Sequence, residues 1–398
     1  MKILLLGYGK TTISLMKMLS FYNIDYFISA KEDINNEKYL KYNKNLFYLT
    51  DIDYVIKSPG IKKDDSIVQL LLKKFVFISE LDLLYLLNIK TKVIAVTGSN
   101  GKTTCVLLLK NLLEKAKYKV LVCGNSHDPI SDYFLEFNKL DFLIIELSSF
   151  QLTFLKYYHP FIATIINLEP NHLDSYKNVY EYYQDKMNIF KYQTSDDYFI
   201  YNPKLKLLKN YKIPSKIICY DANINTKFKY YEQYQILSAV CKILSLNINL
   251  LSETINDFVP LKFRENIVNV RNITFINDAK STSVAATNFA LKNIEQKSNI
   301  ILIIGGKDKK IDYEKLNLKC VKYVLIYGEI KKHFQKGDKY LLFKNLNEAF
   351  KKAISIKLEN KIVLFSPATS SFDQYNNYQE RGIEFDNLIK NFEEKSND

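Results

Sequence analysis

The residues best suited to chemistry form one stretch of the chain, Thr97-Gly-Ser-Asn-Gly-Lys-Thr-Thr104. It follows a short apolar, β-branched run, residues 92–96, which predicts a buried strand, and it precedes a leucine-rich run, residues 103–117, which predicts a helix. A glycine turn between a strand and a helix directs backbone N–H groups and the positive helix end toward phosphate oxygens. Lys102 can then neutralise the β and γ phosphates, and the Thr103 hydroxyl can bind Mg²⁺. The stretch therefore predicts a nucleoside triphosphate site.

Two further polar groups follow strands expected in the same region. Residues 141–146 predict a strand that ends in Glu146, and residues 162–168 predict a strand that leads into a loop containing His172. Ligands of open α/β sheets bind outside the carboxyl ends of the strands, so we expect Lys102, Glu146 and His172 at one edge. His172 alone could equally be a loop histidine with a structural role. A carboxylate and a phosphate loop nearby favour metal binding.

The N-terminal segment carries part of a dinucleotide-binding pattern. Residues 2–6 predict a strand, and Gly7-Tyr-Gly-Lys-Thr-Thr12 turns into a helix that extends to about Leu19. Thr12 occupies the position of the third glycine, and Ile28-Ser-Ala-Lys31 lacks the acidic residue that binds a ribose. These departures disfavour a hydride-transfer domain, whereas a Rossmann-like domain that binds another phosphorylated group fits the pattern.

Three strands expected in the last part of the chain also end in polar loops. Those loops are Asp278-Ala-Lys-Ser-Thr282, Gly305-Gly-Lys-Asp-Lys309 and Ser366-Pro-Ala-Thr-Ser-Ser-Phe-Asp373. They predict a second α/β sheet with a ligand at its carboxyl edge.

Composition narrows the class of protein. The chain has 398 residues, 47% of them hydrophobic, which indicates a folded protein of two or three domains. Its net charge is +13, with 56 basic and 43 acidic residues, and all but three of the basic residues are lysines. The lysines are spread along the chain without the basic–aromatic pattern of a nucleic-acid site. No apolar run reaches the roughly 18 residues of a membrane span, and the N-terminus is too poor in apolar residues for a signal peptide. Five cysteines (105, 123, 219, 241, 320) lack metal-binding spacing, so we expect reduced core thiols in a cytoplasmic protein.

The expected fold is α/β with three domains. A Rossmann-like N-terminal domain would span residues 1–89, a central phosphate-loop ATP-binding domain residues 90–261, and a Rossmann-like C-terminal domain residues 262–398. Pro260 marks the second linker, and residues 260–263 are the expected hinge.

Taken together, the motifs resemble those of one family, the UDP-N-acetylmuramoyl-L-alanine:D-glutamate ligases (MurD) of the Mur ligase superfamily. Val96 stands where the general phosphate-loop pattern has its first glycine, but the loop that follows is similar to that of the superfamily. Glu146-Leu-Ser-Ser-Phe-Gln-Leu152 and the segment 366–382 look specific to the D-glutamate-adding branch. The Asp-Asn-Pro-Arg signature of the diaminopimelate- or lysine-adding branch is absent. The resemblance covers nearly the whole chain.

The resemblance implies an ATP-dependent amide-bond ligase of peptidoglycan synthesis, expected as a cytoplasmic monomer. The carboxylate of UDP-N-acetylmuramoyl-L-alanine would attack the γ-phosphate of ATP and form an acyl phosphate. The amine of D-glutamate would then attack the acyl carbon, and phosphate would leave the tetrahedral intermediate. Such chemistry depends on charge neutralisation more than on acid–base groups.

The resemblance also implies roles for individual residues. Catalysis would involve Lys102, Glu146, His172 and Lys186, and two Mg²⁺ ions would bind Thr103, Glu146, His172 and a carbamylated Lys186. The expected ATP contacts are Gly98, Ser99, Asn100, Gly101, Lys102, Thr103, Thr104, Gln235, Arg264, Asp278 and Lys280. Contacts to the UDP-sugar substrate are expected from Lys10, Thr11, Ser58, Gly60 and Asn125, and contacts to D-glutamate from Thr282, Lys309, Ser371, Phe372 and Tyr378.

The chain departs from the family at several ligand-binding positions. Ser29-Ala-Lys31 replaces the usual Asp-Thr-Arg at the uracil end, and Glu232 and Gln235 stand where asparagines usually lie near the adenine. Asn125 is followed by Ser126-His127 rather than Ile-Gly.

Two other functions stay open. One is another ligase of the superfamily, such as folylpolyglutamate synthase. The other is a non-catalytic nucleotide-binding protein, which the joint presence of Lys102, Glu146 and His172 argues against.

Overall fold

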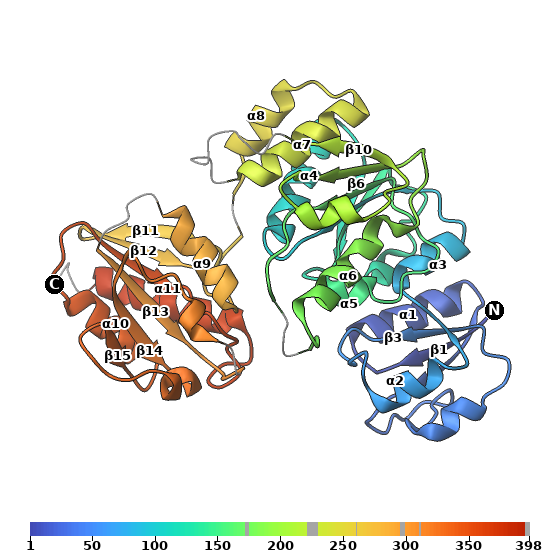
Figure 1. Ribbon diagram of the computed structural model, residues 1–398, viewed down its shortest axis with the longest axis horizontal. Coiled ribbons are helices and arrows are strands. Elements are labelled where there is room, and N and C mark those ends of the chain that lie inside the picture. The colour runs from blue at the N-terminus through green and yellow to red at the C-terminus, as the bar shows by residue number, and fades with distance from the viewer. Residues whose placement is uncertain (172–174, 221–229, 260, 295–298, 310–311, 395–398) are drawn as a thin grey trace. The chain divides into compact units, whose positions relative to one another are not determined.

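The computed structural model describes residues 1–171, 175–220, 230–259, 261–294, 299–309 and 312–394. The chain forms two compact units, Met1–Phe258 and Val259–Asp398 (Figure 1). The first unit contains two sheets and the second unit contains one.

The first sheet has four parallel strands in the order β2-β1-β3-β4. Alternate residues of the first strand belong to two different apolar clusters, because helices and loops cover both faces of the sheet. The predicted strand at residues 2–6 is confirmed, and the following helix extends two residues beyond Leu19. The elements are β1 (Lys2–Leu6), α1 (Lys10–Phe21), β2 (Asp25–Ser29), β3 (Tyr54–Lys57), α2 (Ser66–Leu71), β4 (Val76–Ile78) and α3 (Glu80–Leu86).

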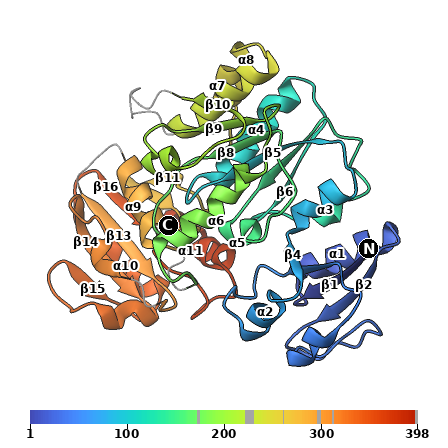
Figure 2. The ribbon, with the colours of Figure 1, turned by 45° about the vertical axis from the view of Figure 1, so that its right-hand side comes forward.

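The central sheet has six parallel strands in the order β10-β9-β8-β5-β7-β6. Helices α4, α7 and α8 pack together on one face, whereas α5 and α6 contribute to the core on the other (Figure 2). The strands are β5 (Lys92–Thr97), β6 (Val120–Gly124), β7 (Phe142–Glu146), β8 (Ile162–Ile165), β9 (Tyr198–Tyr201) and β10 (Lys216–Cys219). The helices are α4 (Lys102–Lys115), α5 (Ser149–Leu152), α6 (Val179–Lys191), α7 (Tyr231–Leu244) and α8 (Asn249–Asn256).

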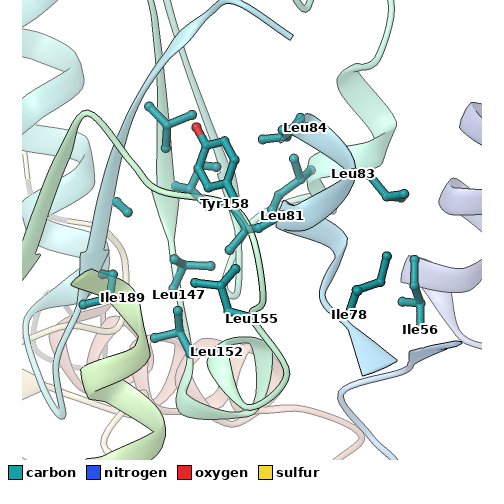
Figure 3. Packing of buried hydrophobic residues seen from close by; sticks show 14 of the residues in the cluster. Ile56, Ile78, Leu81, Leu83, Leu84, Leu147, Leu152, Leu155, Tyr158 and Ile189 are labelled. Atoms are coloured by element: carbon teal, nitrogen blue, oxygen red, sulfur yellow. The ribbon is translucent and has the colours of Figure 1, made fainter. Parts of the chain in front are cut away.

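One apolar core joins the first two sheets. Ile56, Ile78 and Leu81 from the N-terminal region belong to the same cluster as Leu147 and Leu155 from the central region (Figure 3). The two regions therefore form a single compact unit, although the predicted boundary at residues 89 and 90 separates their sheets.

A buried carboxylate reinforces this junction. Asp82 on α3 is fully buried and accepts hydrogen bonds from the backbone N–H groups of Tyr157 (2.8 Å) and Tyr158 (3.0 Å). It also caps its own helix by accepting from the Ser79 N–H (2.8 Å). The side chain thus ties the start of α3 to the chain between α5 and β8.

The second unit has one six-stranded sheet in the order β11-β12-β16-β13-β14-β15. Only the β11–β12 pair is antiparallel among the described strands, and the others are parallel. Apolar clusters lie on both faces of this sheet. Its elements are β11 (Asn266–Val270), β12 (Ile273–Asn277), α9 (Val284–Asn293), β13 (Ile300–Gly305), β14 (Val321–Tyr327), β15 (Tyr340–Leu342), α10 (Leu346–Ser355), β16 (Lys361–Phe365) and α11 (Tyr378–Glu394).

Some expectations need correction. Cys105, Cys123 and Cys241 are buried as predicted, but Cys219 is exposed and Cys320 is half-buried. Cys219 ends the edge strand β10, most of whose side chains are exposed. Pro260 lies outside the described residues, and Phe263 is buried in the core of the second unit, which places it beyond any hinge. No helix in the described part of the chain has both the length and the apolar character needed to cross a membrane.

Candidate active site

The phosphate loop connects β5 to α4 at the carboxyl end of the central sheet. Gly101, at the start of α4, has a φ angle of 78°, a region in which a β-carbon is strained. A β-carbon there would also lie 2.5 Å from Nε2 of Gln233, on α7. The Lys102 ammonium folds back over the turn and donates to the carbonyl oxygens of Gly98 (2.8 Å) and Ser99 (3.1 Å). The predicted strand, turn and helix are therefore present, with the lysine held over the turn.

The segment that follows β8 holds the phosphate loop in place through hydrogen bonds. The Ser99 N–H donates to the carbonyl oxygen of Asn167 (3.1 Å), and the Asn100 N–H donates to Asn167 Oδ1 (2.9 Å). Ser99 Oγ donates to the Glu169 carbonyl oxygen (2.8 Å), and Asn100 Nδ2 donates to Glu169 Oε2 (2.8 Å). Asn167 Nδ2 in turn donates to Glu232 Oε2 on α7 (2.9 Å). The sequence predicts that this strand continues to residue 168, but it ends at Ile165, and Asn167 and Glu169 instead form hydrogen bonds with the loop.

Glu146 ends β7, next to β5, with 1% of its surface exposed. Its Oε1 accepts hydrogen bonds from Asn125 Nδ2 (2.9 Å) and Ser126 Oγ (2.9 Å), and His127 Nε2 lies 3.4 Å from its Oε2. Burial alone would raise the pKa of this carboxyl, but the His127 imidazole, the charge of Lys102 and the Asn125 hydrogen bond lower the pKa to about 2. Glu146 is thus an ionised carboxylate beside the phosphate loop.

Lys186, on α6, reaches the same loop from the other side. Its ammonium donates to the Gly98 carbonyl oxygen (2.9 Å) and to Thr97 Oγ1 (3.3 Å), and only 1% of the residue is exposed. Burial, helped by the charge of Lys102, moves the pKa of Lys186 well below that of an ordinary lysine. Lys102 and Lys186, which are 84 positions apart in the sequence, therefore meet at one carbonyl oxygen.

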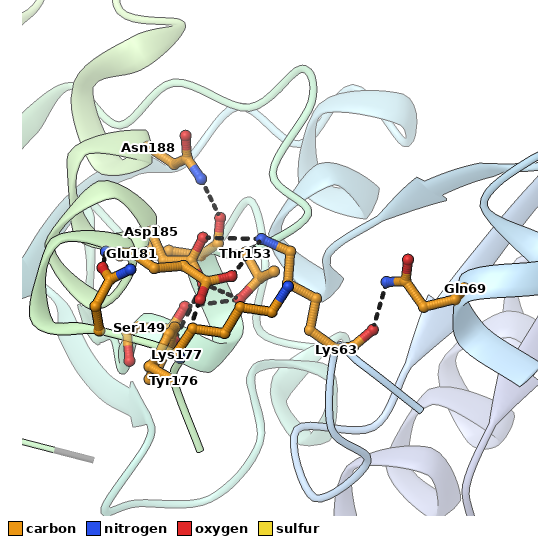
Figure 4. A network of polar contacts seen from close by, with 11 residues as sticks. Lys63, Gln69, Ser149, Thr153, Tyr176, Lys177, Glu181, Asp185 and Asn188 are labelled. Atoms are coloured by element: carbon orange, nitrogen blue, oxygen red, sulfur yellow. Dashed lines mark hydrogen bonds and ion pairs between the residues drawn. The ribbon is translucent and has the colours of Figure 1, made fainter. Parts of the chain in front are cut away.

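A polar network connects the first sheet to helix α6 (Figure 4). Lys63 Nζ lies 3.8 Å from Asp185 Oδ1 and 3.8 Å from Glu181 Oε1. Asp185 Oδ2 also accepts from Thr153 Oγ1 (2.8 Å) and from the Tyr176 hydroxyl (3.1 Å). Burial raises the pKa of Asp185, and the charge of Lys63 and the two hydroxyls oppose that rise. The network fixes the helix that carries Lys186.

The residues expected at the UDP-sugar end follow two neighbouring strands. Lys10 and Thr11 open α1 after β1, and Ser58 and Gly60 follow β3. Lys10 forms an ion pair with Asp128 of the central region, so this corner also faces the central sheet.

A cavity of about 30 Å³ lies next to Thr11, between the first two sheets. Lys57 and Glu80 line it, and burial moves their pKa values in opposite directions, to about 8 for Lys57 and to about 7 for Glu80. The Lys57 ammonium donates to the carbonyl oxygens of Ser58 (2.9 Å) and Ile61 (2.6 Å), which shapes the turn after β3.

In the second unit, one arginine joins three strand ends. Arg381 is completely buried, and its Nη1 donates to the carbonyl oxygen of Gly305 (3.0 Å). Its Nη2 donates to the carbonyl oxygens of Ala279 (3.1 Å) and Thr369 (3.0 Å). These carbonyls lie at or just after the ends of β13, β12 and β16, which are neighbours in the sheet. The three loops expected to bind ligands therefore share one edge.

The other predicted residues of this unit lie on these loops or at their borders. Asp278 is buried and accepts from Ser366 Oγ (2.7 Å), and burial raises its pKa to about 7. Lys280 Nζ lies 5.3 Å from the centre of the Tyr378 ring. Arg264, Thr282 and Lys309 are half-buried, Ser371 is buried and Phe372 is 65% exposed.

The predicted site residues divide between the two units. The phosphate loop, Glu146 and Lys186 lie in the first unit, with Gln235 half-buried on α7. His172 lies outside the described residues. In the parts of the chain that the structure describes, no three His, Cys, Asp or Glu side chains are grouped so that they could hold a metal ion. That the residues of both units complete one site remains a prediction.

Several residues near the site were not predicted. His127, Asp185 and Arg381 act through contacts between segments distant in sequence, which no local pattern reveals. For His127 and Arg381, the sequence offered one signal, the rarity of their residue types, because the chain has only four histidines and three arginines; Asp185 had no such signal.

Comparisons with known proteins agree with this architecture. Residues 96–271 match the Mur ligase middle domain family. The MurF ligase of Thermotoga maritima, solved in complex with ADP, is similar in fold, with a TM-score of 0.63 at 15% identity over 99% of this chain and 95% of that chain. MurF from Acinetobacter baumannii gives a TM-score of 0.62 at 15% identity over 96% and 90% of the two chains.

Relatives found by sequence identify which family of Mur ligases the chain belongs to. The UDP-N-acetylmuramoylalanine–D-glutamate ligase of Francisella tularensis subsp. holarctica (strain OSU18) is 35% identical over 99% of this chain and 97% of the relative. The ligase of the same name from Francisella tularensis subsp. novicida (strain U112) is 36% identical with the same coverage. With that identity over almost its whole length, the chain belongs to the family of UDP-N-acetylmuramoylalanine–D-glutamate ligases.

Proposed function

We propose that this ligase uses ATP to join D-glutamate to the L-alanyl carboxylate of UDP-N-acetylmuramoyl-L-alanine. The observation that supports this most directly is the convergence of Lys102, Lys186 and Glu146 on one fastened phosphate loop, in a chain of this family. The substrate carboxylate would attack the γ-phosphorus and release ADP. The amine would then attack the acyl phosphate carbon, lose a proton and displace phosphate.

Charge neutralisation by the chain's own residues fits this reaction. Lys102 would exchange its carbonyl partners for the phosphate oxygens on which negative charge changes during transfer. In the second unit, Arg264, Asp278 and Lys280 are proposed to contact the nucleotide. Lys309, with the hydroxyls of Thr282 and Ser371, would suit the two carboxylates of D-glutamate.

The residues near Glu146 fit a divalent cation. Glu146 Oε2 is buried, and His127 Nε2, which the described residues place against it, lies 3.4 Å away, beyond an ordinary hydrogen bond, so this oxygen can accept a cation. We propose that Glu146 and Thr103 hold one Mg²⁺ and that His172 and a carbamylated Lys186 hold a second. Bound Mg²⁺ would neutralise phosphate charge and orient the γ-phosphate.

The test is a phosphate-release assay on the purified chain with ATP and UDP-N-acetylmuramoyl-L-alanine. We expect release with D-glutamate and far less with L-glutamate. Release that requires a folate and L-glutamate would instead indicate folylpolyglutamate synthase. ATP binding without release in any mixture would indicate a non-catalytic nucleotide-binding protein. The monomeric state and the cytoplasmic location stay predictions.

A further inference from the structure

The turn after β6 holds a histidine against Glu146. Gly124 N–H donates to the Asp128 carbonyl oxygen (2.8 Å), and His127 N–H donates to the Gly124 carbonyl oxygen (2.7 Å). Gly124 is paired with Glu146 across the two strands, and a β-carbon at Gly124 would lie 2.3 Å from the Glu146 carbonyl oxygen. The turn therefore lies directly on the end of β7, which brings the His127 side chain to the Glu146 carboxylate.

The hydrogen bonds to the Glu146 carboxylate are unequally divided between its two oxygens. Asn125 and Ser126 both donate to Oε1, whereas His127 Nε2 is the group that faces Oε2. Their separation of 3.4 Å exceeds the 2.7–3.2 Å of ordinary N–H···O hydrogen bonds. Within the described chain, both atoms are buried, and apart from this long contact with each other neither has a hydrogen-bond partner. Buried polar atoms without a close partner are uncommon, and a water molecule or an ion is what usually satisfies them.

The spacing of these two atoms suits adjacent ligands of one ion. Two ligands about 2.1 Å from an octahedral cation lie about 3 Å apart, so 3.4 Å needs only a small adjustment. The donor pair is one imidazole nitrogen and one carboxylate oxygen. Mg²⁺ takes oxygen ligands almost exclusively, and imidazole suits first-row transition metals such as Fe, Ni, Cu and Zn. Mn²⁺ also favours oxygen ligands, but it accepts one imidazole beside them more readily than Mg²⁺ does.

We propose that His127 Nε2 and Glu146 Oε2 together bind one divalent cation, and that this nitrogen–oxygen pair makes the site favour a transition-metal ion such as Mn²⁺ over Mg²⁺. The proposed function already places a cation at Glu146, and this proposal adds His127 as a further ligand of that cation. It therefore rests on the proposed function for the cation and for the bound nucleotide.

Pulsed electron paramagnetic resonance of the full chain with Mn²⁺ and ADP tests the nitrogen ligand directly. We expect a ¹⁴N hyperfine coupling from imidazole in the unaltered protein and its clear reduction in His127→Gln. Because the predicted second ion would keep the His172 imidazole, complete loss is expected only in the double variant His127→Gln/His172→Gln. The matched control is His159→Gln, since His159 forms a similar histidine–carboxylate pair with Asp197 (2.9 Å) elsewhere in the unit. His172→Gln, which removes the predicted ligand of the second ion, should keep the coupling.

Metal affinity supplies a second readout. By titration, His127→Gln should lose on the order of tenfold in Mn²⁺ affinity and little in Mg²⁺ affinity. An unchanged ¹⁴N coupling or equal losses for both ions would overturn the proposal, and an unchanged melting temperature would show that the variant is folded.

The experiments can refute the proposed function and the proposed His127 ligand independently of each other. Phosphate release with D-glutamate but no His127-dependent coupling would refute the nitrogen ligand alone. The coupling without any ligation would refute the proposed function alone.

Discussion

The carbonyl oxygen of Gly98 accepts hydrogen bonds from two lysines whose surroundings give them different properties. Lys102 is half-buried at the start of α4, where a mobile cation can follow phosphate oxygens. Lys186 is buried, and its pKa is lowered by that burial and by the charge of Lys102. We therefore expect Lys102 to act as a cation and Lys186 to be available as a neutral amine.

Replacing Lys102 should slow turnover severely while leaving the fold intact. Lys102→Ala removes the charge that neutralises the transferred phosphoryl group, a loss of about 10² to 10³ in kcat. The matched control is Lys110→Ala on the same helix, where Lys110 pairs with Glu114 at the surface. Steady-state kinetics and thermal melting of both variants check this, and turnover near normal in Lys102→Ala would remove the loop lysine from the mechanism.

We predict that Lys186 is carbamylated. A neutral amine can add CO₂ and lose a proton, which converts the uncharged side chain into an anion. ¹³C nuclear magnetic resonance of protein equilibrated with ¹³CO₂ should show a carbamate signal that Lys186→Ala lacks. Lys186→Ala should also lose activity that acetate partly restores, whereas Lys191→Ala, at the end of the same helix, should keep both signal and activity. Full activity in Lys186→Ala would refute the carbamate.

Among the elements, those defined by short-range patterns could be predicted, and those defined by long-range contacts could not. Glycine turns after apolar runs located β5, the phosphate loop and α4 because all three are contiguous. The early end of β8 was not predictable, since it depends on hydrogen bonds between Asn167 and a loop far away in sequence. The antiparallel pairing of β11 with β12 was missed as well, because a turn between them carried no recognised signal.

Arg381 connects three elements, and its replacement should destabilise the second unit. Arg381→Lys keeps the charge, but a single ammonium cannot reach three carbonyl oxygens on separate loops. We expect a loss of about 3 kcal/mol, because buried acceptors would lose their donors. Arg271→Lys, at an exposed arginine of the same unit, should cost far less. Denaturant unfolding checks this, and equal small losses would show that Arg381 is not a structural link.

At the scale of the whole molecule, the shared core predicts how the chain unfolds. The first two sheets should unfold together, because Leu81 and its neighbours belong to the core of both. Leu81→Ala should lower the stability of residues 1–258 by about 2 to 5 kcal/mol. Leu364→Ala, at a buried position in the second unit, should lower only the transition of that unit.

Differential scanning calorimetry distinguishes these outcomes. Two transitions are expected, with Leu81→Ala shifting one and Leu364→Ala shifting the other. A separate third transition for residues 1–89, or its selective proteolysis in Leu81→Ala, would show that the two sheets are independent.

The hydrogen bonds between the phosphate loop and Asn167 involve only its first half, so the two halves of the loop have different roles. The backbone N–H groups of Ser99 and Asn100 are engaged with Asn167, so this half serves as an anchor. The half from Gly101 onward belongs to the first turn of α4, where the helix dipole is available to a phosphate. A change at Asn167 would therefore reshape the loop through its anchor, whereas a change at Gly101 would act on the helix end that faces a phosphate.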